Sequence, residues 1–230
     1  MGRKEEKIIR FTSKVKLEDL LLIYITCVAS AYPLLFDFTR VKPFFSSDLI
    51  AAIVHYLLIF LFFFLIPFII ITFIYKIPLK EAGLNFKNFK KGTLFILITL
   101  PILAFLTYHG GKQEVFKRVY PFVKSMKNHP SKIVCVEFVY LFYYIGWEFF
   151  FRGIIMLILS KRLGFTGALA LQTTISTIMH YSKPDGEIIL ALIAGLVLGY
   201  YVYKFRTIWF AILIHYITGI LMDIFSMYVK

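Results

Sequence analysis

Seven long apolar stretches dominate this sequence of 230 residues and restrict the folds that it can adopt. We place them at residues 17–38, 48–75, 92–108, 132–160, 165–180, 186–204 and 207–228. A helix needs about 20 mostly apolar residues to cross a bilayer, and these stretches approach or exceed that length. Hydrophobic residues make up 60% of the chain, which is more than one soluble core would bury. The sequence therefore predicts an all-α, polytopic membrane helical bundle of about seven transmembrane helices.

The segments between these stretches leave no room for a separate soluble domain. We expect a basic cytoplasmic arm at residues 1–16, followed by a single membrane domain at residues 17–230. The first stretch is too long for a signal peptide and lacks a clear small-residue cleavage site, so we expect a retained helix. Cys27 and Cys135 both fall within predicted spans, where small buried thiols are more common than a disulfide.

The net charge of +13 is spread over short loops between the apolar stretches. This distribution argues against nucleic-acid binding, which uses a basic patch on one folded face. With a cytoplasmic N-terminus, fifteen Lys and Arg residues lie on the inner side of the membrane and ten on the outer side. Because positive charge concentrates on the cytoplasmic side of membrane proteins, we expect an integral membrane protein with its N-terminus in the cytoplasm.

Two of the loops have distinctive compositions. Residues 76–91 combine Pro, Gly and Asn with aromatic and Lys residues, which predicts contact with anionic membrane lipids. Residues 109–132 open with two glycines and contain two prolines, so we expect irregular chain with one or two helical turns around residues 115–126. A loop of this length is able to act as a lid.

Ionisable side chains are rare inside membrane helices and usually face the bundle interior, so each one is a candidate functional residue. The last four spans carry Glu137, Glu148, Arg152, His180, Glu187, His215 and Asp223. His55 stands alone in the second span, and we expect it to hydrogen-bond to a neighbouring helix instead.

The spacing of these residues predicts part of their geometry. Glu148 and Arg152 are four residues apart on one helix, with the acid first, so they can form an ion pair. Glu137 lies within about 20° of Glu148 around the same helix and about 16 Å away along it. Counting from the short turns places His180 at nearly the height of Glu148 and the other candidates within about half the bilayer.

A carboxylate flanked by two histidines suits two kinds of chemistry. In the first, Glu148 activates water as a general base while His180 and His215 orient the water or donate to an oxyanion. In the second, the same three residues hold a divalent metal such as zinc, whose bound water is the nucleophile. The sequence leaves both open. Supporting roles are assigned to Arg152, Asp223, Glu187 and Glu137.

Residues 130–228 resemble the membrane-embedded CAAX prenyl endopeptidase and bacteriocin-processing family, called CPBP or Abi, which is similar to the Ras-converting-enzyme type of CAAX protease. The resemblance is carried by Glu148-Phe-Phe-Phe-Arg152-Gly153, by Met179-His180 and by His215. These residues match parts of the family motifs EExxxRG, Phe-x-x-x-His and His-x-x-x-Asn or Asp. The resemblance implies an intramembrane endopeptidase whose substrate is a peptide or protein, with or without a prenyl group.

The sequence departs from the family motifs at three positions. Trp147 stands where the first glutamate, the water-activating base of the family, is expected. Ser176 replaces the aromatic residue of the second motif, and Gly219 replaces the Asn or Asp of the third.

Other residues are candidates for the missing groups. Glu148 itself can serve as the base, or Glu187 or Glu137 can reach the same cavity. Asp223, one turn beyond Gly219, can replace the polar partner of His215.

We therefore predict an intramembrane endopeptidase of the CAAX-protease type in a prokaryotic cell membrane. The alternative is a catalytically inactive protease-fold membrane protein with an immunity, scaffold or lipid-binding role, because two catalytic motif positions are changed. A transporter is less well supported, since the first three spans carry almost no polar residues for a pathway.

Overall fold

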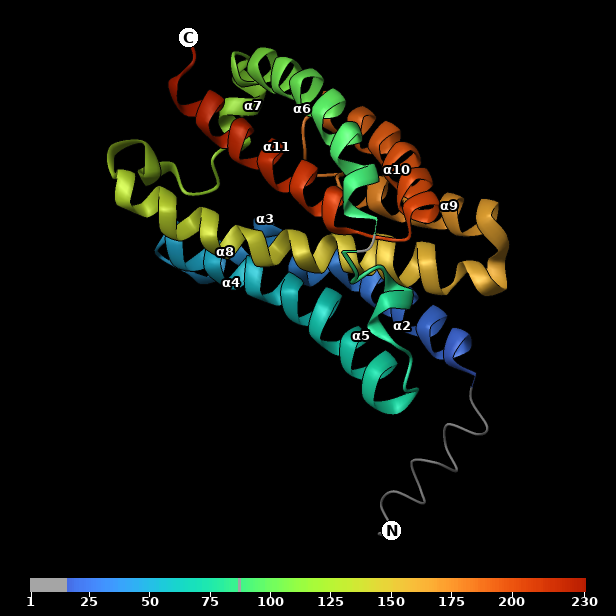
Figure 1. Cartoon of the computed structure of the whole chain (residues 1–230). Helices are drawn as coiled ribbons and strands as arrows, with labels where there is room; N and C mark the ends of the chain where they lie inside the picture. The colour runs from blue at the N-terminus through green and yellow to red at the C-terminus, as the bar shows by residue number, and fades with distance from the viewer. Residues whose placement is uncertain (1–15, 87) are drawn as a thin grey trace.

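The computed structural model describes residues 16–86 and 88–230, which form a bundle of helices without strands (Figure 1). The α-helices are α2 (Leu17–Ala31), α3 (Phe38–Val41), α4 (Asp48–Ile59), α5 (Ile66–Ile69), α6 (Phe89–Gly111), α7 (Glu114–Val119), α8 (Pro130–Glu148), α9 (Ser160–Ile178), α10 (Asp185–Phe205) and α11 (Trp209–Tyr228). The predicted all-α fold class is confirmed. The predicted basic arm lies, except for Lys16, outside the described residues.

Shorter π- and 3₁₀-helical segments join several of these helices. The π-helical segments are η1 (Tyr32–Phe36), η3 (Phe60–Leu65), η4 (Ile70–Ile74) and η7 (Phe149–Ile158). The 3₁₀ segments are η2 (Lys42–Phe44), η5 (Leu79–Ala82) and η6 (Lys124–Asn128). Because the segments from α4 to η4 follow one another without a break, they form one long helix, and α8 with η7 forms another.

Six helices in the described residues are long and apolar enough to cross a membrane. They are Leu17–Phe36, Asp48–Ile74, Lys90–Gly111, Ser131–Ile158, Asp185–Phe205 and Trp209–Tyr228. Their ends lie within about three residues of six of the predicted stretches. The other predicted stretch, residues 165–180, corresponds to α9, which buries the polar residues Gln172 and Thr173 and is not among the six. The seventh crossing is therefore not confirmed.

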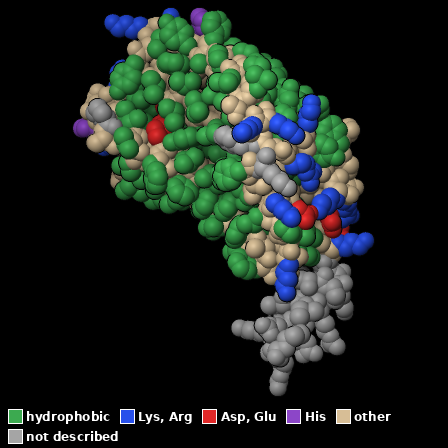
Figure 2. Space-filling view, viewed as in Figure 1, with side chains coloured by type: hydrophobic (Ala, Val, Ile, Leu, Met, Phe, Trp, Pro, Cys, Tyr) green, Lys and Arg blue, Asp and Glu red, His purple; other side chains and the backbone are tan. Residues whose placement is uncertain are grey.

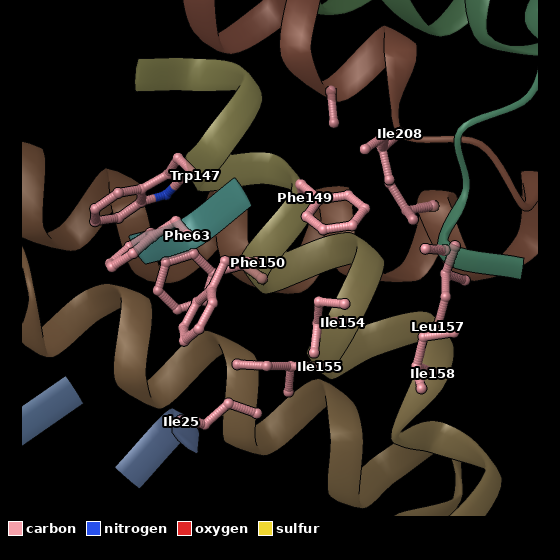
Figure 3. Close-up of a cluster of buried hydrophobic side chains, with 14 of the residues drawn as sticks. Ile25, Phe63, Trp147, Phe149, Phe150, Ile154, Ile155, Leu157, Ile158 and Ile208 are labelled. Carbon is pink, nitrogen blue, oxygen red and sulfur yellow. The ribbon is translucent and has the colours of Figure 1, made fainter. Parts of the chain in front are cut away.

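The helix formed by α8 and η7 lies at the centre of the bundle. Its α8 half packs against α4 and α11, and its η7 half packs against α9 and α10. All ten residues of η7 are buried. Figure 3 shows the aromatic rings around its start, where Phe63 stacks on Phe150 at 4.5 Å between ring centroids and lies 5.7 Å from Trp147. This aromatic cluster fixes the position of Trp147.

Helix α6 lies along α11 (Figure 1). The contact is close at Gly111, where an added Cβ would lie 2.8 Å from the backbone carbonyl carbon of Phe225 and 3.0 Å from the nitrogen of Ser226. Since this contact holds the chain against α11, α6 continues to Gly111 and does not end at residue 108 as predicted. The following segment contains α7 and η6, the two short helical pieces expected around residues 115–126.

The connection between η4 and α6 folds back onto the protein. The backbone N–H of Ile208 donates to the carbonyl of Gly83 at 3.1 Å, and the Asn85 side chain donates to the carbonyl of Arg206 at 2.6 Å. Gly83 has a φ of 82°, a left-handed conformation that favours glycine. The predicted contact of residues 76–91 with anionic lipids stays a prediction.

The surface has the character expected in a bilayer. Figure 2 shows hydrophobic side chains over most of the visible face, with Lys and Arg gathered toward its lower right. Helix α6 alone exposes Leu94, Leu97, Ile98, Ile102 and Phe105. An apolar surface of this extent is stable when lipid chains cover it.

Candidate active site

A cavity of about 850 Å³ lies among α6, α8, α10 and α11, with residues of α7 over one side. Much of its wall is aliphatic or aromatic. The polar and ionisable side chains on the wall include Tyr144, Arg152, His180, Lys183, Glu187 and His215. The cavity thus brings four of the predicted site residues, Arg152, His180, Glu187 and His215, to one space.

Glu148 connects two of these residues. Its Oε1 accepts hydrogen bonds from Nδ1 of His215 on α11 at 2.7 Å and from Nη1 of Arg152 at 3.2 Å. The ion pair with Arg152 has the predicted four-residue spacing, and both side chains are buried. Two cationic or hydrogen-bonding partners compensate for burying the carboxylate inside the bundle.

The Glu148 carboxylate does not contribute to the cavity wall. Its side chain is 0% exposed, whereas that of His215 is 26% exposed. Because an ionised carboxylate only accepts hydrogen bonds, Nδ1 of His215 must be the donor, and the neutral ring then carries a free lone pair on Nε2. His215 is therefore the member of the pair that faces the cavity.

His180 presents a second imidazole to the same cavity. It follows the end of α9, and its Nδ1 lies 2.6 Å from the carbonyl oxygen of Ser176. A carbonyl only accepts, so Nδ1 donates and Nε2 is left free. The residue that replaces the family's aromatic side chain, Ser176, thus holds His180 through its backbone.

Trp147 packs against both histidines. Its ring centroid lies 5.4 Å from that of His180 and 6.4 Å from that of His215, and the planes are nearly perpendicular in both cases. The Trp147 side chain is 2% exposed and also contacts the ring of Phe63. The position at which the family carries its first glutamate is occupied here by part of an aromatic core (Figure 3).

Gly219 lies one turn after His215 and is covered by Tyr144. A Cβ added at Gly219 would overlap the Tyr144 hydroxyl and lie 2.9 Å from its Cζ. The Tyr144 ring also packs on the His215 ring, with 4.6 Å between centroids. Both Tyr144 and Gly219 line the cavity. The sequence pattern alone did not identify Tyr144, although its position one turn before Glu148 on α8 was a signal for it.

Polar contacts tie the segment after α7 to the start of α10 at the edge of the cavity. The Tyr120 hydroxyl donates to Oε1 of Glu187 at 2.7 Å, and Nζ of Lys183 lies 4.7 Å from the Tyr120 ring centroid and 4.0 Å from that of Phe122. Burial lowers the pKa of Lys183, while Glu187 acts in the opposite direction. Burial, reinforced by Glu187, raises the pKa of Tyr120 well above its usual range. Glu187 therefore lies at this edge of the cavity and is hydrogen-bonded to Tyr120, not to Glu148.

Glu137 and Asp223 lie away from the cavity. The two carboxyl groups are close enough to influence each other electrostatically, and Lys124 and Lys183 also act on Asp223. Among the described residues, the carboxyl oxygens of Glu137 and Oδ1 of Asp223 have no hydrogen-bond partner, and neither residue lines the cavity. Their predicted supporting roles stay predictions.

The candidate residues do not form a set of metal ligands. Among the described residues, no group of three or more His, Cys, Asp or Glu side chains is arranged to hold a metal ion, and Glu148, His180 and His215 are no exception. The Trp147 ring packs against both histidine rings. These residues do not fit a metal centre, and we derive no reaction step through one.

Comparison with known proteins gives one match. Residues 129–221 match the family model described as type II CAAX prenyl endopeptidase, Rce1-like. The matched segment contains Glu148, Arg152, His180 and His215. No curated protein and no solved structure matches the chain.

Proposed function

We propose that this chain is an active intramembrane endopeptidase, because residues 129–221 match the family model of Rce1-like type II CAAX prenyl endopeptidases. The observation that carries the proposal is the hydrogen bond between the buried Glu148 carboxylate and His215. The His215 side chain lines a cavity of about 850 Å³. This arrangement supports hydrolysis of a peptide bond that enters the cavity.

In the proposed mechanism His215 is the general base and Glu148 is its partner. Nε2 of His215 takes a proton from water as the water oxygen attacks the carbonyl carbon of the substrate, and the Glu148 carboxylate stabilises the imidazolium that forms. The electron pair of the carbonyl moves to its oxygen. When the tetrahedral intermediate collapses, the carbon–nitrogen bond breaks and the proton on His215 passes to the leaving amine.

The other residues have supporting roles in this mechanism. Arg152 keeps Glu148 ionised by its ion pair inside the bundle. His180, fixed by the Ser176 carbonyl, offers Nε2 as a hydrogen-bond acceptor that orients the water or the leaving amine. This assignment replaces the missing first glutamate of the family with a histidine and carboxylate pair.

We propose that the substrate is a peptide with an apolar part that occupies the aliphatic wall of the cavity, either side chains or a prenyl group. We further propose that the N-terminus lies in the cytoplasm of a prokaryotic cell. With that orientation, the edge formed by Tyr120, Lys183 and Glu187 faces the outer side of the membrane.

The proposal is tested by cleavage of quenched peptide libraries, prenylated and unprenylated, by the full-length protein in detergent. We expect the wild type to cleave at least one class, and His215→Ala and Glu148→Gln to lose the activity. His55→Gln is the control. His55 is a buried histidine whose ring is hydrogen-bonded, in this case to the backbone carbonyl of Phe36 at 2.7 Å, but it does not line the cavity.

The alternative, an inactive protease-fold protein, is favoured by one observation. Trp147 packs against both histidines at the position where the family carries its first glutamate. Absence of cleavage in both library classes, by wild-type protein that is folded, would support the inactive protein and contradict the proposed activity.

A further inference from the structure

The wall of the cavity beside His215 carries a phenol hydroxyl where the family motif has an amide or carboxylate. An added Cβ at Gly219 would overlap the Tyr144 hydroxyl. The Tyr144 side chain therefore occupies the volume that any side chain at position 219 would need. The position of the Tyr144 side chain therefore requires glycine at position 219.

The Tyr144 side chain is held firmly. It is 4% exposed, its ring packs on His215 at 4.6 Å, and the ring of Tyr140 lies 4.5 Å away on the other side. A hydroxyl on a ring with only two rotatable side-chain bonds is well oriented by such contacts. Oriented donors of this kind are the ones that stabilise developing charge in a transition state.

The position of Tyr144 relative to the base is also suitable. Tyr144 and Glu148 are one turn apart on α8, and His215 and Gly219 are one turn apart on α11. The Glu148–His215 hydrogen bond and the Tyr144–Gly219 contact therefore lie on neighbouring turns of the same two helices. A carbonyl group held at the base is thus within one helical turn of the phenol hydroxyl.

From this juxtaposition we infer that the Tyr144 hydroxyl is the hydrogen-bond donor to the oxyanion formed during peptide hydrolysis. The inference rests on the proposed function and names a further catalytic residue for it. As water adds to the carbonyl carbon, the electron pair of the carbonyl bond moves to oxygen, and the Tyr144 O–H donates to that oxygen without giving up its proton. When the carbonyl re-forms, the hydrogen bond weakens again.

Tyr144→Phe removes the donor and keeps the ring that packs on His215. Loss of one oxyanion donor lowers kcat by about 10²- to 10³-fold, and we expect this loss with little change in KM. Tyr143→Phe is the matched control, because Tyr143 is the neighbouring tyrosine on α8 and does not line the cavity. A kcat for Tyr144→Phe equal to that of Tyr143→Phe overturns the inference.

A double variant separates a donor role from a structural one. Tyr144→Leu vacates the space over Gly219, so that Tyr144→Leu/Gly219→Asn can place an amide N–H₂ there. We expect this variant to be about tenfold more active than Tyr144→Leu, while Tyr144→Leu/Gly219→Val, which adds bulk without a donor, gives no recovery. Equal recovery by Asn and Val would show that only packing matters.

A binding measurement separates this inference from the proposed activity. Phosphinate peptides imitate the tetrahedral intermediate, and matched amide peptides imitate the substrate. We expect the wild type to bind the phosphinate library more tightly than the amide library, and Tyr144→Phe to lose about 10²-fold of the phosphinate affinity alone.

These outcomes are distinguishable. Phosphinate binding that depends on Tyr144, without cleavage of any peptide, supports the donor and contradicts the proposed activity. Cleavage that is insensitive to Tyr144→Phe supports the activity and contradicts the donor. Phosphinate binding no tighter than amide binding also overturns the inference.

Discussion

The imidazole of His215 stands between the cavity and the carboxylate of Glu148, with 2.7 Å between Nδ1 of the histidine and Oε1 of the glutamate. A buried carboxylate in this position fixes one tautomer of the imidazole and stabilises the imidazolium. In the proposed mechanism the glutamate therefore acts on the reaction through the histidine, whereas the sequence left open direct activation of water by Glu148.

Glu148→Gln is expected to reduce kcat strongly. The amide can present N–H₂ to Nδ1, which favours the wrong tautomer, and it cannot stabilise an imidazolium. Loss of such a partner lowers kcat by about 10²- to 10⁴-fold. The measurement is steady-state cleavage of the best library peptide, with His55→Gln as the control. Full activity in Glu148→Gln would exclude the proposed pair.

The Glu148 carboxylate also forms a buried ion pair with Arg152. Removing one partner of a buried ion pair leaves an uncompensated charge and lowers the free energy of unfolding by about 3–5 kcal/mol. We expect that loss for Glu148→Ala, and a smaller one for the double variant Glu148→Gln/Arg152→Gln. Unfolding in detergent, followed by circular dichroism, measures both. The idea is wrong if the double variant is the less stable of the two.

Much of the fold was predictable because the length of an apolar stretch determines a membrane helix almost by itself. The helix Asp48–Ile74 differs from its predicted bounds by one residue. Ends that depend on contacts were less predictable. Helix α6 continues through Gly111 because that glycine lets it approach the backbone of α11 at Phe225, a contact between segments that are distant in the sequence.

In the site, too, some contacts follow from spacing in the sequence and others depend on how the helices pack. The pair of Glu148 and Arg152 follows from helical spacing, and it is present as predicted. Glu137 lies on the same helix, yet it lies near Asp223 and does not line the cavity, since the neighbour that each carboxylate meets depends on how α8 and α11 pack. Tyr144 could be identified only from the structure, which shows that its hydroxyl occupies the space over Gly219.

Trp147 is expected to be structural, so that conservative replacement is tolerated. Trp147→Phe keeps an aromatic ring beside Phe63 and should retain most of kcat, whereas Trp147→Ala leaves a cavity and lowers the free energy of unfolding by about 3–5 kcal/mol. Trp147→Glu places a carboxylate among aromatic rings and should be less stable without being more active. A gain in kcat for Trp147→Glu would show that the wild-type chain lacks its base.

Two glycines in the left-handed region provide a test of fold energetics. Gly83 has a φ of 82°, and an added Cβ would lie 2.8 Å from side-chain atoms of Ile208 and Leu157; Gly164 has a φ of 69° with nothing within 4 Å. Gly164 also has a ψ of 172°, a combination that almost only glycine adopts, so Gly164→Ala should lower the free energy of unfolding by about 1–3 kcal/mol from backbone strain alone. Gly83 has a ψ of 4°, and steric overlap adds to its strain, so Gly83→Ala should lower the free energy of unfolding by about 2–4 kcal/mol. A loss of only about 1 kcal/mol for Gly83→Ala in thermal unfolding would mean that the contact of Gly83 with Ile208 and Leu157 is loose.

Chelation tests whether the reaction uses a metal. The described residues include no cluster of three ligands, and the Trp147 ring packs against both histidine rings. A mechanism that uses the Glu148–His215 pair as base therefore predicts that 1,10-phenanthroline and EDTA leave the cleavage rate within about twofold of the untreated rate, since neither removes a group that the mechanism needs. A zinc endopeptidase run in parallel confirms that the chelators are effective. Loss of cleavage that added Zn²⁺ restores would replace the histidine base with metal-bound water, and would require Glu148, His180 and His215 to rearrange into a ligand set.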